Sequence, residues 1–501
     1  MNSRTKRNRK MAAGAAVFAL ALGGTACTDL VVPNFNDPSV EDLTTNPTVN
    51  SVVAAAQNLM STARGNTSSR VLYVGIWGRE AYDLRPEEPR TTTNRLIGPL
   101  DPVNGGAFWG YSSLKNIQVL LDAVDAVEAI PEPDKNAIRG FAKTVAAQSL
   151  WNIIIMHTSF GAALEPPADP GDELSPIVSE DQVYARIHQL LDEAQQHLSS
   201  AGSSFPFGLT GGYAGFSTPS DFIRLNRALK ARYHKYNAEW GQAMTALGGS
   251  FMNPGGDLDY GLYHNYSTNP GDAANPFFSR ASHFAHPRFL ADAQLKPDGT
   301  PDDRAGKVEV QSQVFSLLGI DVTERYTIYP NQDSPVPWVR NEELILIHAE
   351  AALATGDRQT AINDVNIVRA AHGLAPFEDP GNDAAVLDEI LYNKFMSLAL
   401  EGGFTYYDAR QYGRTDQLPR ARSDHVVFLQ LPFPQNECLA RPELGTGRHQ
   451  PSATNYGCCG ADRLAYMRGG GRGLLRPPPP LPSGPRPRTG SRAAVPGRPL
   501  S

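Results

Sequence analysis

Few residues of this 501-residue chain have the types and spacing that enzyme chemistry needs. His283 and His286 have a spacing that metal ligands often show, but no Cys or Glu motif accompanies them. Glu342 and Glu343 are adjacent, so on a helix they point in different directions and cannot act as a general acid and base together. The sequence also lacks a phosphate-binding glycine loop. It therefore predicts no catalytic residue, no metal site and no cofactor.

Cys27 carries the clearest chemical signal. An apolar run at 11–22 follows a basic start, and this run is as long as a signal-peptide core but too short to span a bilayer. Four small residues then precede Cys27, as in bacterial lipoprotein signals, although Gly24 stands where leucine is usual. We therefore expect a signal peptide over 1–26 and acylation of Cys27, which would anchor the protein to a membrane by its lipid, palmitate for example. An ordinary secretory signal is the alternative.

Charge divides the chain into three parts. The first ten residues hold five basic and no acidic side chains, and residues 443–501 hold nine arginines against two acidic residues. Residues 11–442 contain 31 basic and 50 acidic side chains, a net charge of −19. An acidic body repels phosphate backbones, so nucleic acid is excluded as a partner. The Pro-, Gly- and Arg-rich composition of 443–501 predicts a disordered tail, either a genuine appendage or the product of a shifted reading frame.

Helical periodicity dominates between these ends. Apolar residues recur with helical spacing over 49–63, 113–128, 138–158, 221–247, 341–355, 358–371 and 385–401, and after a capping box formed by Ser179 and Gln182. The two segments that flank Gly356 predict a helix pair, closed by Gly373 as the C-terminal cap. Residues 250–335 are rich in Gly, Pro, Asn and Asp, which predicts a long loop region with a short strand or two around 307–329.

The order of these segments resembles the SusD/RagB family of outer-membrane nutrient-binding lipoproteins. The resemblance covers roughly residues 27–442, and the stretch that resembles the family most runs from Pro335 to Gly373. Further matching stretches are Phe108-Trp109, 138–161, 182–194, Glu401-Gly402, Asp408, Arg410 and 431–437. Lys394-Phe395 stands near the place where the family usually has Glu-Arg, and Gly403-Phe404 replaces an expected Arg.

The resemblance implies a mainly α fold, in which tetratricopeptide-like helix pairs form one α-rich domain over 27–442 with long loop excursions. It implies a lipid-anchored protein of the outer membrane, displayed on the cell surface, that binds glycans or other nutrients. The ligand would be an oligosaccharide or a peptide, delivered to a TonB-dependent outer-membrane transporter of the SusC/RagA type. Motif residues such as Glu350 and Arg369 are expected to form a helix–helix ion pair, a structural role.

Sugar rings bind to flat apolar surfaces with amides and carboxylates nearby, so aromatic residues in loops are the candidate contacts. Two clusters have this setting, and their rings are Trp77, Tyr82, Tyr263, Tyr266, Phe277 and Phe278. We interpret the chain as a binding protein and not an enzyme. The alternative is a secreted carbohydrate-active hydrolase on a helical scaffold, which needs two carboxylates facing each other across a cleft. A structural lid without a ligand of its own is a third possibility.

Overall fold

The computed structural model describes residues 39–65, 67–87, 108–169, 171–278 and 283–441. The expected signal peptide, Cys27 and the tail from 443 lie outside the described residues. No helix in the described part is long and apolar enough to cross a membrane.

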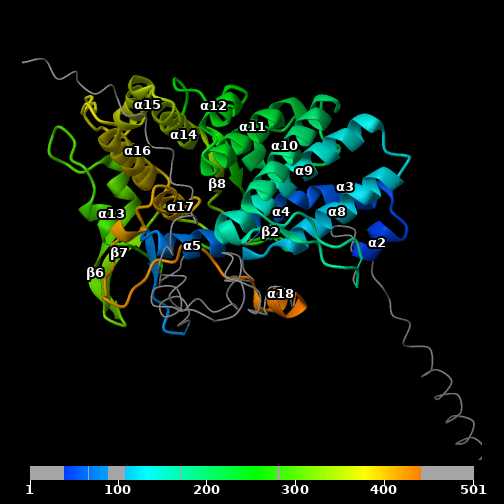
Figure 1. Ribbon diagram of the computed structural model, residues 1–501, viewed down its shortest axis with the longest axis horizontal. Coiled ribbons are helices and arrows are strands. Elements are labelled where there is room, and N and C mark those ends of the chain that lie inside the picture. The colour runs from blue at the N-terminus through cyan, green and yellow to red at the C-terminus, as the bar shows by residue number, and fades with distance from the viewer. Residues whose placement is uncertain (1–38, 66, 88–107, 170, 279–282, 442–501) are drawn as a thin grey trace, which may run out of the picture.

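Helices make up most of the described chain and confirm the expected mainly α fold. Neighbouring helices of the main body pack side by side along its long axis, from α9 through α12 to α16 (Figure 1), in the manner of tetratricopeptide repeats. The helices are α2 (Val40–Thr44), α3 (Val49–Gln57), α4 (Leu59–Arg64), α5 (Thr67–Trp77), α8 (Tyr111–Ala126), α9 (Glu132–His157), α10 (Glu180–Ser199), α11 (Pro219–Tyr236), α12 (Trp240–Gly248), α13 (Arg288–Ala291), α14 (Asn341–Ala354), α15 (Arg358–Ala371), α16 (Asp383–Ser397), α17 (Phe404–Gln411) and α18 (Gln435–Ala440).

Local sequence signals account for several helix ends. The predicted capping box begins α10: Gln182 N–H donates to the hydroxyl of Ser179, and Ser179 N–H donates to the side-chain oxygen of Gln182. Gly373 follows α15 with a φ of 77°, a left-handed conformation that favours glycine. The single helix expected over 221–247 is wrong, because the chain breaks between α11 and α12 and Ala238 adopts a φ of 55°.

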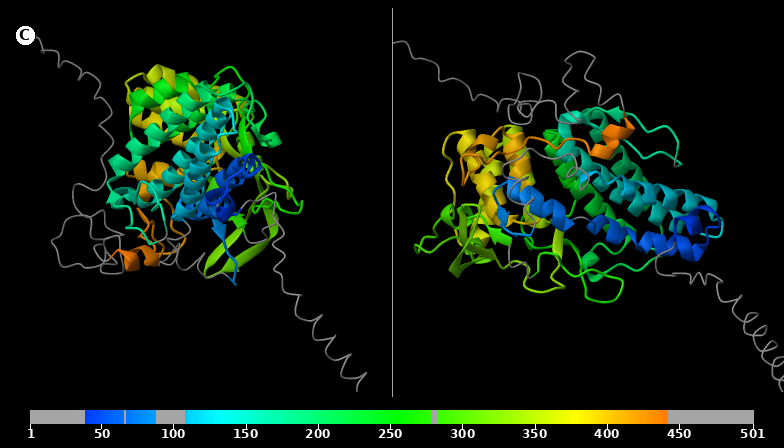
Figure 2. Two further views of the ribbon diagram at one scale, coloured as in Figure 1. Left: turned by 90° about the vertical axis from the view of Figure 1, so that its right-hand side faces the viewer. Right: turned by 90° about the horizontal axis from the view of Figure 1, so that it is seen from below.

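Strands form small antiparallel sheets at the edges of the helical body. The largest sheet has four strands in the order β1 (Ala81–Asp83), β5 (His283–Ala285), β7 (Ile320–Tyr326) and β6 (Val308–Leu317). A two-stranded sheet pairs β4 (Gly261–His264) with β8 (Val336–Arg340). Another pairs β2 (Ala162–Ala163) with β3 (Ile177–Val178). The β6–β7 hairpin matches the strands expected around 307–329, and its turn at Leu318-Gly319 has positive φ at both residues. Figure 2 shows this hairpin beside the helices. Residues 250–335 are thus more regular than predicted.

A buried cluster of four charges joins α11, α14, α16 and α17. Lys394 Nζ lies 2.9 Å from Glu350 Oε2 and 2.7 Å from Asp408 Oδ2. Lys235 Nζ lies 3.2 Å from Glu350 Oε1 and also contacts Asp408. The expected pair of Glu350 with Arg369 is therefore wrong: Arg369 contacts Glu389 instead, because two lysines already occupy both oxygens of Glu350.

Candidate ligand-binding site

The first expected aromatic cluster lies inside the core. Trp77 ends α5 with 2% of its surface exposed, and its ring packs 6.0 Å from Phe108 and 5.6 Å from Tyr406, centroid to centroid. Tyr82 in β1 is equally buried, and its ring centroid lies 4.8 Å from that of His286. These rings have no free face, so the structure leaves neither of them available for stacking against a sugar.

The second expected cluster is split. Tyr266 is 7% exposed and Arg64 covers its ring at 5.0 Å, while Phe277 is half-buried against Tyr329, with ring centroids 5.1 Å apart. Both rings join the buried apolar cluster that also contains Tyr82. Phe278 and Tyr263 are half-buried and stay candidate contacts.

Tyr263 borders a different surface. Its hydroxyl donates to the carbonyl of Asp259 at 2.5 Å. Burial raises the pKa of Tyr263 above its usual value, so this hydroxyl remains a proton donor at neutral pH. The ring thus lies beside the loop that precedes β4.

That loop forms one wall of a groove that sequence reasoning missed, which we call the Tyr260 groove. Its volume is about 530 Å³, within the range of small-molecule sites. It is lined by Arg224, Ser250, Phe251, Met252, Asn253, Gly256, Asp257, Tyr260 and Asn341. These residues come from α11, the segment after α12 and the start of α14, three elements that pack together.

Tyr260 is the exposed ring of the groove. It is 37% exposed, and its ring packs against Phe216 at 5.5 Å and Phe251 at 5.7 Å, centroid to centroid. Phe216 and Phe251 are themselves buried, so they hold one side of Tyr260 while another side meets solvent. A ring supported in this way is a platform for the C–H face of a sugar.

Hydrogen bonds to Asn341 fix the shape of the loop. The Asn341 side-chain amide donates to the carbonyls of Asn253 at 2.8 Å and Asp257 at 3.0 Å, and its side-chain oxygen accepts from Asn253 N–H at 2.8 Å. The backbone N–H of Asn341 donates to the carbonyl of Tyr260, also at 2.8 Å. Because these bonds exist before any ligand arrives, binding costs little ordering of the loop.

Polar side chains complete the groove. Arg224 is partly exposed and donates to Asp221 Oδ1 at 3.1 Å and the carbonyl of Gly215 at 3.3 Å. Its guanidinium leaves further N–H donors for a ligand. Together with the Asp257 carboxylate and the Asn253 amide, it offers donors and acceptors to hydroxyl groups. The turn-forming run from Asn253 to Asp257 just before a strand was the available sequence signal.

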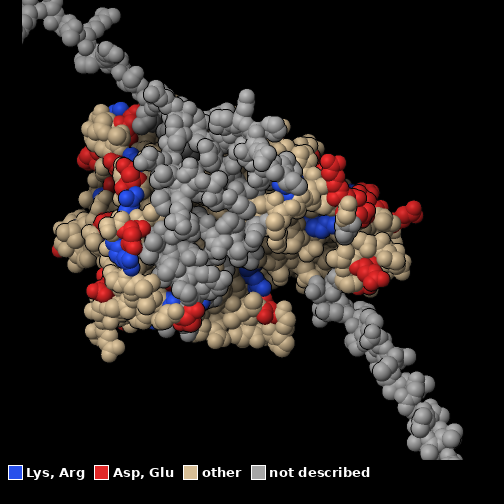
Figure 3. All heavy atoms as spheres, turned by 60° about the horizontal axis from the view of Figure 1, so that its bottom comes forward, with Lys and Arg blue, Asp and Glu red and all other residues tan. Residues whose placement is uncertain are grey.

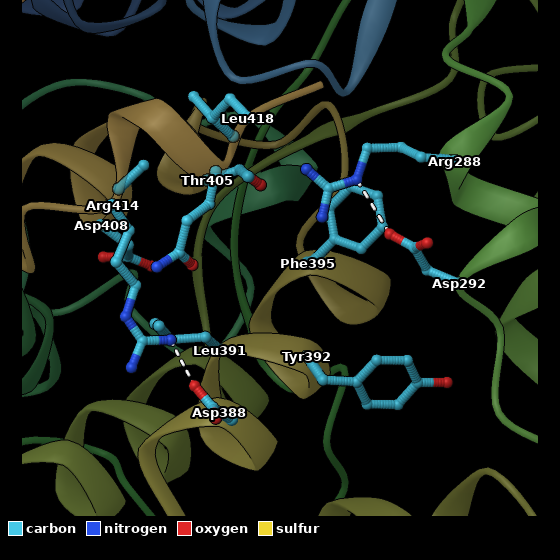
Figure 4. Close-up of a pocket in the computed structure, with 12 residues that line it drawn as sticks. Arg288, Asp292, Asp388, Leu391, Tyr392, Phe395, Thr405, Asp408, Arg414 and Leu418 are labelled. Atoms are coloured by element: carbon cyan, nitrogen blue, oxygen red, sulfur yellow. Dashed lines mark hydrogen bonds and ion pairs between the residues drawn. The ribbon is translucent and has the colours of Figure 1, made fainter. Parts of the chain in front are cut away.

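A second cavity, which we call the Phe395 cavity, lies between α13, α16 and α17 and is smaller, at about 250 Å³. Figure 4 shows the Arg288 guanidinium over the Phe395 ring, 4.4 Å from its centroid, with Arg288 also paired to Asp292 at 3.0 Å. Across the cavity Arg414 contacts Asp388. Its aromatic face and its rim charges already have protein partners, so it suits a ligand less well than the Tyr260 groove.

The Tyr260 groove does not have the carboxylate arrangement of a glycosidase, and the three aspartates that line the Phe395 cavity are each paired with a basic side chain. Asp257 is the one carboxylate among the described residues that line the Tyr260 groove, and glycoside hydrolysis uses two. Burial raises the pKa of Glu80 and of Glu401, as a general acid requires. Glu80, however, accepts from the N–H groups of Leu400 and Thr405, Glu401 pairs with Arg340, and neither lines these cavities.

The His283 and His286 side chains do not converge on a common point. His283 Nε2 lies 3.4 Å from Asp83 Oδ2, whereas His286 packs on Tyr82 and its Nδ1 accepts from Arg288 N–H at 3.1 Å. Burial lowers the pKa of His286 to about 3, so it is neutral in the folded protein. The two histidines serve the packing of β5.

Solved structures share this fold. A SusD superfamily protein from Bacteroides vulgatus is 18% identical, with a TM-score of 0.60 over 81% of this chain and 100% of that one. A laminarin-binding SusD-like protein is 17% identical, with a TM-score of 0.57 over 77% and 97%. A protein from Bacteroides vulgatus described as an outer membrane protein for nutrient binding is 14% identical, with a TM-score of 0.56 over 78% and 94%. No curated protein matches the sequence.

A family model adds evidence from the sequence itself, because the model for the SusD family matches residues 320–431. By this segment and by its fold, the chain is similar to the SusD/RagB family. The matched segment runs from β7 through α17 and contains Glu350, Lys394 and Asp408 of the buried charge cluster. Of the residues that line the Tyr260 groove, it contains only Asn341. The matched segment therefore carries architecture, and most of the groove lies outside it.

Proposed function

We propose that this SusD-like protein is a binding protein that captures a glycan at the Tyr260 groove and releases it chemically unchanged. The shared fold, which extends to a laminarin-binding SusD-like protein, carries this proposal. The exposed ring of Tyr260 with Arg224, Asn253 and Asp257 around it supplies the chemistry that sugar hydroxyls and C–H faces require.

The proposal extends to cell-surface capture for import. Acylation of Cys27 would hold the body at the outer membrane, where the similar nutrient-binding protein from Bacteroides vulgatus is also described. From there the ligand passes to a TonB-dependent transporter of the SusC/RagA type. Mass spectrometry of the mature N-terminus tests the anchor, which requires an acyl group on Cys27. A β-barrel of this type recovered with the protein from detergent-solubilised outer membranes tests the partner.

The acidic body supports a neutral ligand over a polyanion. Residues 11–442 carry a net charge of −19. On the face in Figure 3, acidic side chains lie at both ends of the molecule. An acidic surface repels sulfated or uronate-rich chains at low ionic strength, so neutral oligosaccharides are the preferred class.

Binding of a panel of neutral oligosaccharides by isothermal titration calorimetry tests the site. Tyr260→Ala removes the platform, and we expect a loss of ~1–3 kcal/mol, a dissociation constant weaker by roughly 5- to 150-fold. Tyr260→Phe keeps the ring and should bind within about twofold of the wild type. Leu295→Ala changes an exposed apolar residue that does not line the groove and serves as a control for general surface effects.

Three results would count against the proposal. Wild-type affinity in Tyr260→Ala, with weaker binding in Tyr263→Ala or Phe278→Ala, would place the site at the rings expected from the sequence. Products released from the glycan would favour the hydrolase. A wild-type protein that binds none of the glycans or peptides tested would favour a structural lid.

A further inference from the structure

Two histidines and a glutamate converge where α10 meets the corner between α11 and α12. His188 lies on α10, His234 lies on α11, and Glu239 immediately precedes α12. The two imidazole rings are stacked, with centroids 3.6 Å apart and an interplanar angle of 11°. Of the residues that the structure describes, this is the one group of three side chains able to hold a metal ion. It lies apart from the Tyr260 groove, whose lining includes none of the three.

The three possible ligand atoms lie close together. Glu239 Oε2 lies 2.6 Å from His234 Nδ1 and 3.2 Å from His188 Nε2. All three atoms lie within 4.8 Å of one another. A tetrahedral Zn²⁺ ion with bonds of ~2.0–2.1 Å separates its ligand atoms by roughly 3.3 Å. Because the lone pairs of two parallel rings do not converge, one imidazole must rotate and Glu239 must move away from His234 before the three atoms can surround an ion.

The cluster is also incomplete without a ligand. Neither ring nitrogen of His188 makes a hydrogen bond of acceptable geometry, although both nitrogens are shielded from solvent. A buried polar group without a partner costs free energy. A cation bound to Nε2 of His188, Nδ1 of His234 and the Glu239 carboxylate would give the buried Nε2 atom of His188 a partner.

The backbone turn that positions Glu239 has a strained conformation. Ala238 adopts a φ of 55°, a left-handed conformation that is unfavourable for alanine. This turn brings the carboxylate of Glu239 against the ring of His234, and Glu239 N–H donates to the His234 carbonyl at 2.9 Å. Strained turns of this kind cluster at functional sites.

We propose that His188, His234 and Glu239 bind a divalent transition metal ion, Zn²⁺ above all. Imidazole nitrogens favour Zn²⁺ and its first-row neighbours, whereas Ca²⁺ and Mg²⁺ take oxygen ligands. Two histidines and a carboxylate leave a fourth position for water, and the Glu239 side chain, 31% exposed, opens the cluster to solvent. The bound ion would tie α10 to the corner between α11 and α12.

Metal titration of the purified full chain without a histidine tag tests the proposal. After treatment with EDTA and its removal, the protein should bind one equivalent of Zn²⁺ by calorimetry, and its Tm should rise with Zn²⁺ but not with Ca²⁺. Co²⁺ should give the visible absorption of a four-coordinate site. His234→Gln should weaken Zn²⁺ binding at least ~100-fold and abolish the Co²⁺ band.

A matched control lies on the same helix. His197 is nine residues after His188, ~13 Å away along α10, and its Nδ1 contacts Asn136. His197→Gln should bind Zn²⁺ like the wild type. If His234→Gln does not fold, Glu239→Gln provides the same comparison at a more exposed ligand. Zn²⁺ affinity that is absent in the wild type, or equal in wild type, His234→Gln and Glu239→Gln, would overturn the proposal.

Discussion

Two consecutive residues of α11 lie in clusters of opposite character. Lys235 points into the buried charge cluster, where two lysines and two carboxylates share four contacts below 3.3 Å. His234 points toward α10, where two histidines share one carboxylate. The first cluster is balanced in charge and buried, with at most 3% of any of its residues exposed. The second is partly open and leaves ring nitrogens without hydrogen bonds.

This contrast separates an architectural cluster from a binding one. Around the first, the hydroxyls of Tyr236 and Tyr412 donate to Asp408 at 3.2 Å and Glu350 at 2.8 Å, which satisfies further lone pairs. Burial disfavours charge on Lys394, but Asp408 and Glu350 outweigh it and raise the pKa of Lys394. A buried network with every member paired holds its helices in one arrangement. A network in which a side chain lacks a hydrogen-bond partner can take that partner from a bound ligand.

Removal of one lysine from the buried charge cluster gives the largest expected effect. Lys394→Met leaves Glu350 Oε2 and Asp408 Oδ2 buried without their nearest cation, which should lower the free energy of unfolding by ~3–5 kcal/mol. Urea unfolding followed by circular dichroism measures it. Arg414→Met, which breaks the exposed pair with Asp388, should cost only ~0–1 kcal/mol. Equal losses in the two variants would show that burial does not distinguish these pairs.

A third histidine, His157, shows what burial does to the pKa of an imidazole that is not paired with a carboxylate. His157 lies between Trp109 and Phe433, and burial lowers its pKa to about 4 from the ordinary 6.5. The unfolded chain therefore binds a proton that the folded protein excludes. The stability from this group is complete above pH 6.5 and is lost as pH falls toward 4, by ~1.4 kcal/mol per pH unit at most.

His157→Phe keeps a ring at this position and removes the titrating group. Its free energy of unfolding, measured in urea at several pH values, should fall less steeply between pH 6.5 and 4 than that of the wild type. The comparison uses slopes because the variant also loses the hydrogen bond from Nδ1 to the Ile153 carbonyl at 2.8 Å. Parallel curves would mean that the pKa of His157 is the same in the folded and unfolded protein.

The sequence predicted the helical body because periodicity and capping are local. The Ser179 capping box and the helix pair around Gly356 lie where the pattern placed them. The break at Ala238 was missed because no Gly or Pro marks it, and a left-handed alanine has no sequence signature. The pairing of Glu350 was wrong because Lys235 and Lys394 approach it from helices far away in the sequence.

The binding surface was harder to predict for the same reason. Loop position suggested Trp77, Tyr82 and Tyr266, but tertiary packing buries all three rings. Tyr260 is exposed because Phe216, 44 residues earlier, supports it from one side only. His188 and His234 are likewise brought together by helix packing alone. Sequence pattern predicts which residues form elements, whereas exposure and convergence depend on how those elements pack.

The smallest expected effect lies in the open cluster. His188→Leu, measured in EDTA, should change the free energy of unfolding by less than ~1 kcal/mol, because His188 makes only the longer of the two contacts with the partly exposed Glu239 carboxylate, 3.2 Å against 2.6 Å for His234. With Zn²⁺ present the same variant should fall clearly below the wild type, since only the wild type gains stability from the ion. A large loss in EDTA would mean that the histidine stack already stabilises the fold as Lys394 does. The contrast between the two sides of α11 would then be one of degree, and the open cluster would no longer stand out as a binding site.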